Sequence, residues 1–187
     1  SSQCAKAAAK ANLVLGQLTR GCTWRDPANL TNLYKVYVRP HLEYAQASWA
    51  PWTQADIQTL EQVQRRFTRQ VSGIGSLPYE ERLGRLRLTT LQARRERGDM
   101  VEAYKIITGK VDVEPSTWFS PLTIREGAAS TRATSGHLNL ARREAISEVR
   151  KNQFSVRVVP LWNSLPDQVK AQDTLNNFKN AYDNIMN

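Results

Sequence analysis

The stretch between Thr53 and Val71 carries the clearest helix pattern in this chain of 187 residues. Thr53 is followed three positions later by Asp56, a spacing typical of side chains that cap the first turn of a helix. The apolar residues after this cap recur every three or four positions, at Ile57, Leu60, Val63, Phe67 and Val71. A helix with one apolar stripe is stable only when that stripe is buried, so the pattern predicts an amphipathic helix packed against a core.

Further start and stop signals predict helices along the first 110 residues. Gly21 is expected to end a first helix, and Asp26 with Pro27 to start a second one that Pro40 interrupts. The expected helices cover residues 5–20, 27–44, 53–71, 78–86 and 90–108. Their inward faces are expected to include Leu13, Leu15 and Leu18 in the first helix and Leu30, Leu33, Tyr34, Tyr37, Val38, Leu42 and Tyr44 in the second.

The pattern changes after residue 110. Pro, Ser, Thr and Gly become frequent over residues 111–141, which predicts a linker or an extended arm. In residues 142–187, Phe154, Val156 and Val158 alternate as in a strand, whereas Val158, Leu161, Trp162 and Leu165 fit a helix. Asp173 and Thr174 are expected to cap a last helix whose inward residues are Leu175, Phe178, Tyr182 and Ile185. The sequence thus predicts a mainly α fold: a helical domain over 1–110, the linker, and a small C-terminal subdomain, helical or mixed α and β, that packs back on the helices.

The net charge of +9 favours a polyanionic partner, because neutralising phosphates releases counterions. The basic residues are 18 Arg and 8 Lys, and guanidinium can bind phosphate with two parallel hydrogen bonds. Nucleic acid is therefore the first candidate, and intramolecular ion pairs are the alternative use of these arginines.

Other classes of function find little support in the sequence. Cys4 and Cys22 with two histidines cannot supply a four-ligand zinc site at sensible spacing, and free thiols are expected in an intracellular protein of the nucleus or cytoplasm. There is no run of about 18 apolar residues, so no membrane span is expected. No two aspartates are adjacent, and no nucleophile pair or glycine-rich phosphate loop is present, so neither catalysis nor a cofactor is expected.

Several blocks of the sequence follow a characteristic order. They are Leu33–Tyr44, Trp49-Ala50-Pro51-Trp52, Leu60–Arg69, Leu77–Leu83, Arg94–Met100 with Tyr104–Ile106, and Val149–Phe154 with Leu161–Pro166. Together they resemble the region after the polymerase core in reverse transcriptases of LINE-type, jockey-like non-LTR retrotransposons, over nearly the whole chain.

This resemblance implies the thumb and post-thumb region of such an enzyme. The polymerase active site of the family, with its two adjacent aspartates, lies upstream of this region. The chain would then be a noncatalytic part that grips template RNA or an RNA·DNA duplex, with DNA as another candidate, in support of target-primed reverse transcription. Its other partner would be the upstream polymerase core.

The candidate nucleic-acid contacts follow from this implication. On the helix that starts after Thr53, arginines opposite the apolar stripe could track phosphates, or one of them could pair with Glu61 four residues earlier. The arginines at 94–97 lie where the helix dipole disfavours cations, so they need either nucleic acid or an ion network with Glu80, Glu81, Glu96 and Asp99. The basic pair at 150–151 could form a flank that orders on RNA or a solvated loop, and two tryptophans could stack on bases or belong to the core. The candidates are Arg65, Arg66, Arg69, Arg94, Arg95, Arg97, Arg150, Lys151, Trp49 and Trp52.

A second hypothesis is a host-adopted helical module that binds another protein, with incidental positive charge. Exposed apolar patches would favour it. The two hypotheses differ in whether the arginines gather on one surface or disperse into separate ion pairs.

Overall fold

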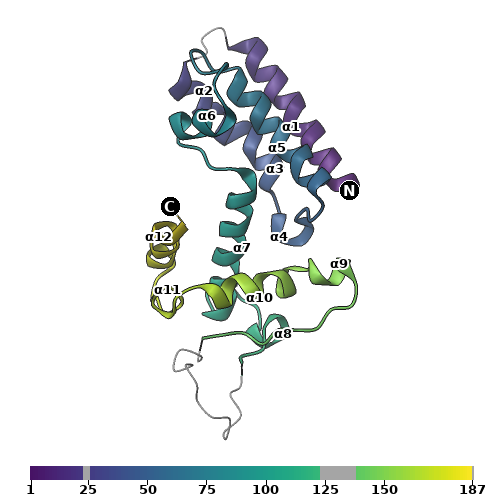
Figure 1. Cartoon of the computed structure of the whole chain (residues 1–187), viewed down its shortest axis with the longest axis vertical. Helices are drawn as coiled ribbons and strands as arrows, with labels where there is room; N and C mark the ends of the chain where they lie inside the picture. Colours follow the sequence, from purple (N-terminus) through teal and green to yellow (C-terminus); the bar gives the residue numbers. More distant parts are fainter. Residues whose placement is uncertain (23–25, 123–137, 187) are drawn as a thin grey trace, which may run out of the picture. The chain divides into compact units, whose positions relative to one another are not determined.

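The computed structural model describes residues 1–22, 26–122 and 138–186 of the chain (Figure 1). These residues are mainly α-helical, which confirms the predicted fold class. The described part contains no β-sheet. Pro121 and Leu140 form an isolated antiparallel β-bridge.

Contacts divide the chain into two compact units, Ser1–Arg95 and Glu96–Asn187, which we call unit 1 and unit 2. The division falls inside one helix, α7 (Leu91–Ile107). The sequence pattern instead places a boundary at residue 110, where the helix signal stops, because periodicity marks the ends of helices and not the neighbours against which each half packs. The expected linker over 111–141 lies partly outside the described residues.

Unit 1 is built on a long N-terminal helix, α1 (Ser2–Gly21), that packs against α5 (Gln54–Arg69) (Figure 1). The other helices of unit 1 are α2 (Pro27–Leu33), the π-helix η1 (Tyr34–Val38), α3 (Arg39–Glu43), α4 (Gln46–Trp49) and α6 (Tyr79–Leu86). Gly21 is the last residue of α1, as predicted. Helix α5 begins after Thr53, whose hydroxyl accepts from the backbone N–H of Asp56 at 3.2 Å, and this confirms the predicted cap.

The buried face of α1 consists of small residues. They are Cys4, Ala7, Ala8 and Ala11, followed by Leu15. Short side chains let the backbone of a helix approach its neighbour closely, which explains why this face contacts α5, η1 and α3. The prediction that Leu13 faces the core is wrong, since its side chain is 54% exposed. The spacing of the leucines did not predict the buried face of α1, because that face consists mainly of alanine.

Proline changes the second predicted helix. The structure divides it into α2, η1 and α3, with Pro40 in the first turn of α3. The backbone N–H of Arg39 reaches the carbonyl of Tyr34, one residue further than in an α-helix, which widens the turn just before the proline. The buried side chains Tyr34, Val38 and Leu42 then recur every four positions. Tyr37 falls between them and Tyr44 follows the end of α3, so both are exposed and their predicted burial is wrong.

A tight connection joins α5 to α6. Gly73 has a positive φ of 76°, a conformation that favours glycine. A Cβ atom on Gly75 would lie 2.5 Å from the carbonyl oxygen of Arg69, so only glycine fits against the end of α5. Pro78 precedes α6 as predicted, and Arg87 ends it in a left-handed conformation.

The described residues of unit 2 form the rest of α7 and five shorter helices: α8 (Pro115–Trp118), α9 (Glu148–Lys151), α10 (Phe154–Ser164), α11 (Asp167–Lys170) and α12 (Leu175–Met186). Of the two alternatives for residues 154–165, the helix is correct. Its buried residues Phe154, Val158 and Trp162 each lie four positions apart. The ring of Phe178 stacks on that of Tyr104 at 4.3 Å and packs against Trp162, which makes an aromatic core.

The last helix is capped as predicted, by the hydroxyl of Thr174, which accepts from the N–H of Asn177. Phe178 and Tyr182 are buried, but Ile185 is 48% exposed, so its predicted burial is wrong. The final turn of α12 extends beyond the core that the two aromatic residues complete.

Candidate nucleic-acid interface

Three arginines of α5 lie opposite its buried stripe. Arg66 and Arg69 are exposed and Arg65 is half-buried, whereas Leu60, Val63 and Phe67 lie in the core. Among the residues that the structure describes, these three arginines form no ion pair. Arg66 and Arg69 lie in the last turn of α5, where the helix dipole stabilises cations.

Two guanidinium groups lie over the aromatic ring of Tyr79. The guanidinium carbon of Arg65 lies 4.0 Å from the ring centroid, and that of Arg82 lies 5.5 Å from it. Arg82 also donates from Nη1 to the backbone carbonyl of Arg65 at 3.2 Å. Tyr79 and Arg82 sit three positions apart on α6, so this helix brings both residues to the arginine-bearing side of α5.

Arg82 is a buried cation, with only 3% of its surface exposed. Burial is the main cause that lowers its pKa, and the charges of Arg69 and Arg65 lower it further. Tyr79 and Glu80 oppose this effect. The three guanidinium groups therefore lie close enough to repel one another, and together they make a local positive potential.

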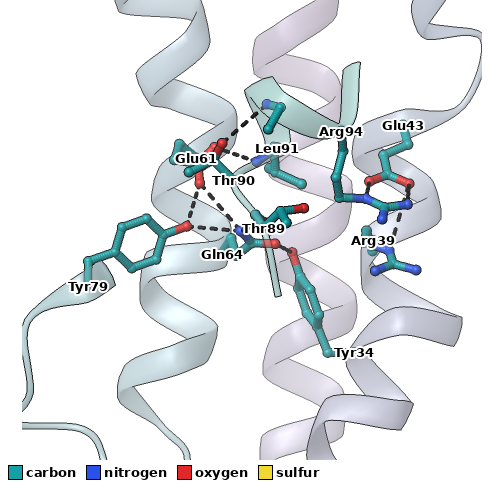
Figure 2. Close-up of polar contacts among 11 residues, drawn as sticks. Tyr34, Arg39, Glu43, Glu61, Gln64, Tyr79, Thr89, Thr90, Leu91 and Arg94 are labelled. Carbon is teal, nitrogen blue, oxygen red and sulfur yellow. Dashed lines mark hydrogen bonds and ion pairs between the residues drawn. The ribbon is translucent and has the colours of Figure 1, made fainter. Parts of the chain in front are cut away.

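Glu61 does not pair with Arg65, which corrects the alternative weighed from the sequence. Its carboxylate accepts from the hydroxyl of Tyr79 and, at 3.0 Å, from the backbone N–H of Leu91 at the start of α7 (Figure 2). A carboxylate at a helix N-terminus is favourable because the first N–H groups of a helix lack partners.

Gln64 completes a buried polar network around this carboxylate. Its side-chain oxygen accepts from Tyr34 at 3.0 Å, and its nitrogen donates to Tyr79 at 2.9 Å and to the carbonyl of Thr89 at 3.0 Å (Figure 2). The network ties α5 to η1, α6 and the start of α7, and so fixes the α5 backbone that carries the arginines.

A cleft of about 500 Å³ runs along the same helix. Its walls come from α5 and the first residues around α7, and its lining is mostly polar: Gln54, Ile57, Gln58, Glu61, Gln62, Arg65, Arg69, Thr90 and Gln92. Glutamine amides can both donate and accept hydrogen bonds, and the two arginines make one part of the cleft positive.

The arginines of α7 are used within the protein. Arg94 makes a two-point ion pair with Glu43, which also lies 3.7 Å from Arg39 (Figure 2). Arg97 makes a second two-point pair with Asp183, at 2.6 and 2.7 Å, which raises the pKa of Arg97. Arg95 is buried.

The acidic partners of Arg94 and Arg97 are Glu43 and Asp183, which were not considered in the sequence. Asp99 pairs with Arg157 of α10, at 2.9 and 3.0 Å. The partners Glu43 and Asp183 are far away in the sequence, so spacing rules could not find them.

The remaining candidates lie apart from this cluster. Trp49 is partly buried against the core of unit 1 and donates from Nε1 to the carbonyl of Tyr44 at 2.7 Å, whereas Trp52 is 47% exposed. In unit 2, Arg150 and Lys151 are exposed on α9, where Lys151 pairs with Glu148 at 2.5 Å.

Sequence reasoning did not single out Tyr79 and assigned Arg82 no clear role. The available signal was their spacing after Pro78, which places both on one face of a short helix. On α6, Arg82 is buried and Arg85 is exposed.

Comparisons with known proteins found no match to this chain. No family model matches the chain, and neither a curated protein nor a solved structure matches it. In the described part of the chain, no three His, Cys, Asp or Glu residues are grouped as for a metal ion. None of the described helices has the length and apolar character needed to cross a bilayer.

Proposed function

We propose that unit 1 binds nucleic acid through the arginines of α5 and α6. The ligand class is template RNA or an RNA·DNA duplex, and DNA is a further candidate. In this proposal the chain is a noncatalytic region of a LINE-like reverse transcriptase that supports target-primed reverse transcription by its polymerase core.

The observation that carries the proposal is the different use of two arginine groups. Arg94 and Arg97 are held in two-point ion pairs, whereas Arg65, Arg66 and Arg69 form none among the described residues. Cations that gather without acidic partners leave their hydrogen-bond donors available for phosphate. A basic face of this kind is the usual electrostatic footprint of nucleic-acid binding.

The mechanism would be contact with the backbone of the nucleic acid. Guanidinium groups donate to phosphate oxygens, and such contacts position a duplex without reading its bases. The cleft beside Arg65 and Arg69 offers glutamine amides at the same surface, which can donate to or accept from sugar hydroxyls and base edges.

The test is fluorescence-anisotropy binding of the whole chain to a hairpin RNA, an RNA·DNA duplex and a double-stranded DNA across a salt series. We expect submicromolar binding at low salt, with a log–log salt slope of about −0.9 for each duplex phosphate contacted. Changing Arg65, Arg66 and Arg69 together to alanine should weaken binding and flatten the slope.

A matched control changes Arg94, Arg97 and Arg20 to alanine, because this removes the same charge from other places. The proposal is wrong if all three ligands fail to bind at low salt, or if the control variant loses as much affinity as the α5 variant while remaining folded.

A second candidate function has its own observation. An apolar cleft of about 440 Å³ is lined by Val14, Gln17, Leu18, Gly21, Cys22 and Tyr37. Leu13, Val36 and Tyr37 are exposed by 54%, 62% and 54%. Such apolar surface favours a host-adopted module that binds another protein. Changing Tyr37 to serine would then abolish capture of that partner and leave binding to nucleic acid unaffected.

A further inference from the structure

Arg82 is buried without a complete set of hydrogen-bond acceptors. Its Nη1 donates to the carbonyl of Arg65, but its Nε has no partner among the residues that the structure describes. Buried donors are almost always paired in native proteins, so an unpaired one calls for a ligand or another explanation. For a guanidinium the missing partner is an acceptor, most favourably an anion.

The surroundings of Arg82 are positive. Arg65 and Arg69 both act electrostatically on it, and Glu80 is the acidic residue with a smaller opposing effect. The ring of Tyr79 faces the guanidinium plane of Arg65 and lies near that of Arg82, but a ring face leaves the in-plane N–H donors unused. The aromatic contact therefore explains where these side chains lie and not what their N–H groups bind.

We propose that Arg65, Arg69 and Arg82 form a site for a single phosphate group, namely one phosphodiester of the bound nucleic acid. This inference rests on the function proposed above and names the group that the arginines hold. Three guanidinium groups supply donors in planar forks that match phosphate oxygens. The buried position of Arg82 strengthens such a bond relative to a solvated one, because screening by water is reduced.

The site would also fix the register of the duplex on the protein. Arg66 and Arg69 have exposed side chains on one turn, so each can reach a phosphate in several positions of the duplex. Arg82 is held by Tyr79 and by the carbonyl of Arg65, so its donors point to a fixed place. A duplex would therefore slide over α5 until one phosphate reaches this place.

The test is ¹⁵N NMR of the arginine Nε–H groups in the whole chain during titration with sodium phosphate, with ionic strength held constant by sodium chloride. We expect saturable shifts at Arg82 and Arg69, and none at Arg20, an exposed arginine of α1 that does not perturb Arg82. Arg69→Gln should raise the dissociation constant for phosphate about tenfold or more, because it removes a charged donor. Arg20→Gln carries the same change of charge and should leave the constant within about twofold.

Arg82→Lys keeps the charge but removes the fork, and it too should weaken phosphate binding by about tenfold. Since this residue is buried, circular dichroism is used to verify that the variant keeps its helices. Arg69 is exposed, so the Arg69→Gln result decides the question even if Arg82→Lys fails to fold.

Non-saturable shifts, or equal shifts at Arg82 and Arg20, would overturn the site. An RNA·DNA duplex is then added to the phosphate-loaded protein, and displacement of phosphate is expected. Saturable phosphate binding that the duplex does not displace would overturn the phosphodiester assignment in favour of a free phosphate group. Duplex binding that leaves the Arg82 signal unchanged would refute this inference while the proposed function stands.

Discussion

Glu61 is a buried carboxylate of unit 1, 8% exposed and hydrogen-bonded to two other helices, α6 and α7. Its two oxygens satisfy Tyr79 and the N–H of Leu91, which begins α7. Changing Glu61 to glutamine replaces one carboxylate oxygen by an NH₂ group. This group would face either the hydroxyl of Tyr79 or the N–H of Leu91, both of which are hydrogen-bond donors. We expect the free energy of unfolding to fall by about 1–3 kcal/mol, measured by urea denaturation followed by circular dichroism.

The matched control is Glu81→Gln, which removes the same charge from an exposed position of α6. It should change the free energy of unfolding by less than about 0.5 kcal/mol. Equal effects of the two changes would mean that the network around Glu61 contributes little to stability.

Two tyrosines of the same network give a pH prediction. Burial raises the pKa of Tyr34 and Tyr79 far above the ordinary tyrosine value. In the unfolded chain both ionise near pH 10, so above that pH the unfolded state binds fewer protons than the folded state. Their contribution to stability is therefore complete below about pH 10 and is lost as the pH rises, by about 1.4 kcal/mol per pH unit for each tyrosine.

Urea unfolding between about pH 8 and 11 measures this slope. The pKa values of Tyr104 and Tyr182 are raised as well, so the whole chain shows a combined slope. Tyr34→Phe isolates one contribution and should reduce the slope by about 1.4 kcal/mol per pH unit. An unchanged slope in this variant would contradict the role of burial at Tyr34.

At the scale of residues, local interactions were predictable and distant ones were not. The caps at Thr53 and Thr174 join residues three apart, so sequence spacing contains them. The partners of Glu61 lie 18 and 30 positions away, and no periodic pattern connects them. The same reason explains why Glu61 appeared to be a partner for Arg65.

At the scale of elements, two ion pairs of α7 differ in burial. The pair between Asp99 and Arg157 joins α7 to α10, with side chains 8% and 18% exposed. The pair between Arg97 and Asp183 joins α7 to α12, with side chains 37% and 38% exposed. Removing one partner of a buried pair leaves an uncompensated charge, whereas water screens an exposed one.

We therefore expect Asp99→Asn to lower the free energy of unfolding by about 3 kcal/mol and Asp183→Asn by less than about 1 kcal/mol. Thermal or urea unfolding of the two variants checks this ratio, and each serves as the charge-matched control of the other. Similar losses for both would contradict the expected effect of burial on these two ion pairs.

Helix ends were more predictable than helix faces. Gly21, Pro78 and Thr90 mark ends correctly, because capping and proline geometry act within a few residues. Faces depend on what each helix packs against, so Leu13 and Ile185 were assigned inward although both side chains are about half exposed. The alternation at residues 154–158 matched a strand only because a short apolar run fits both periods.

At the scale of the whole molecule, the net charge of +9 does not tell which arginines face a ligand. In the described part of the chain, Arg94 and Arg97 form ion pairs, whereas Arg65, Arg66 and Arg69 form none. The candidates at Arg94, Arg95 and Arg97 could not be separated from those at Arg65 and Arg69 by composition or spacing, because the separation depends on Glu43 and Asp183 from distant helices.

This division predicts opposite effects for two changes of equal charge. Arg94→Gln breaks a two-point pair with Glu43 and should lower the free energy of unfolding by about 1–2 kcal/mol, with less than about threefold loss of affinity for an RNA·DNA duplex. Arg66→Gln should leave stability within about 0.5 kcal/mol and reduce the salt slope of binding by about 0.9, the value for one phosphate contact.

Both variants are measured by urea unfolding and by duplex binding across a salt series, so that each has a stability and an affinity value. A different result is possible for Arg94→Gln: a reduced salt slope of duplex binding with unchanged stability. That result would mean that the pair with Glu43 opens to bind the ligand and that α7 belongs to the binding surface. If instead the effects separate as expected, the positive charge of this chain has two functions, since α7 uses it to hold helices together and α5 uses it to bind phosphate.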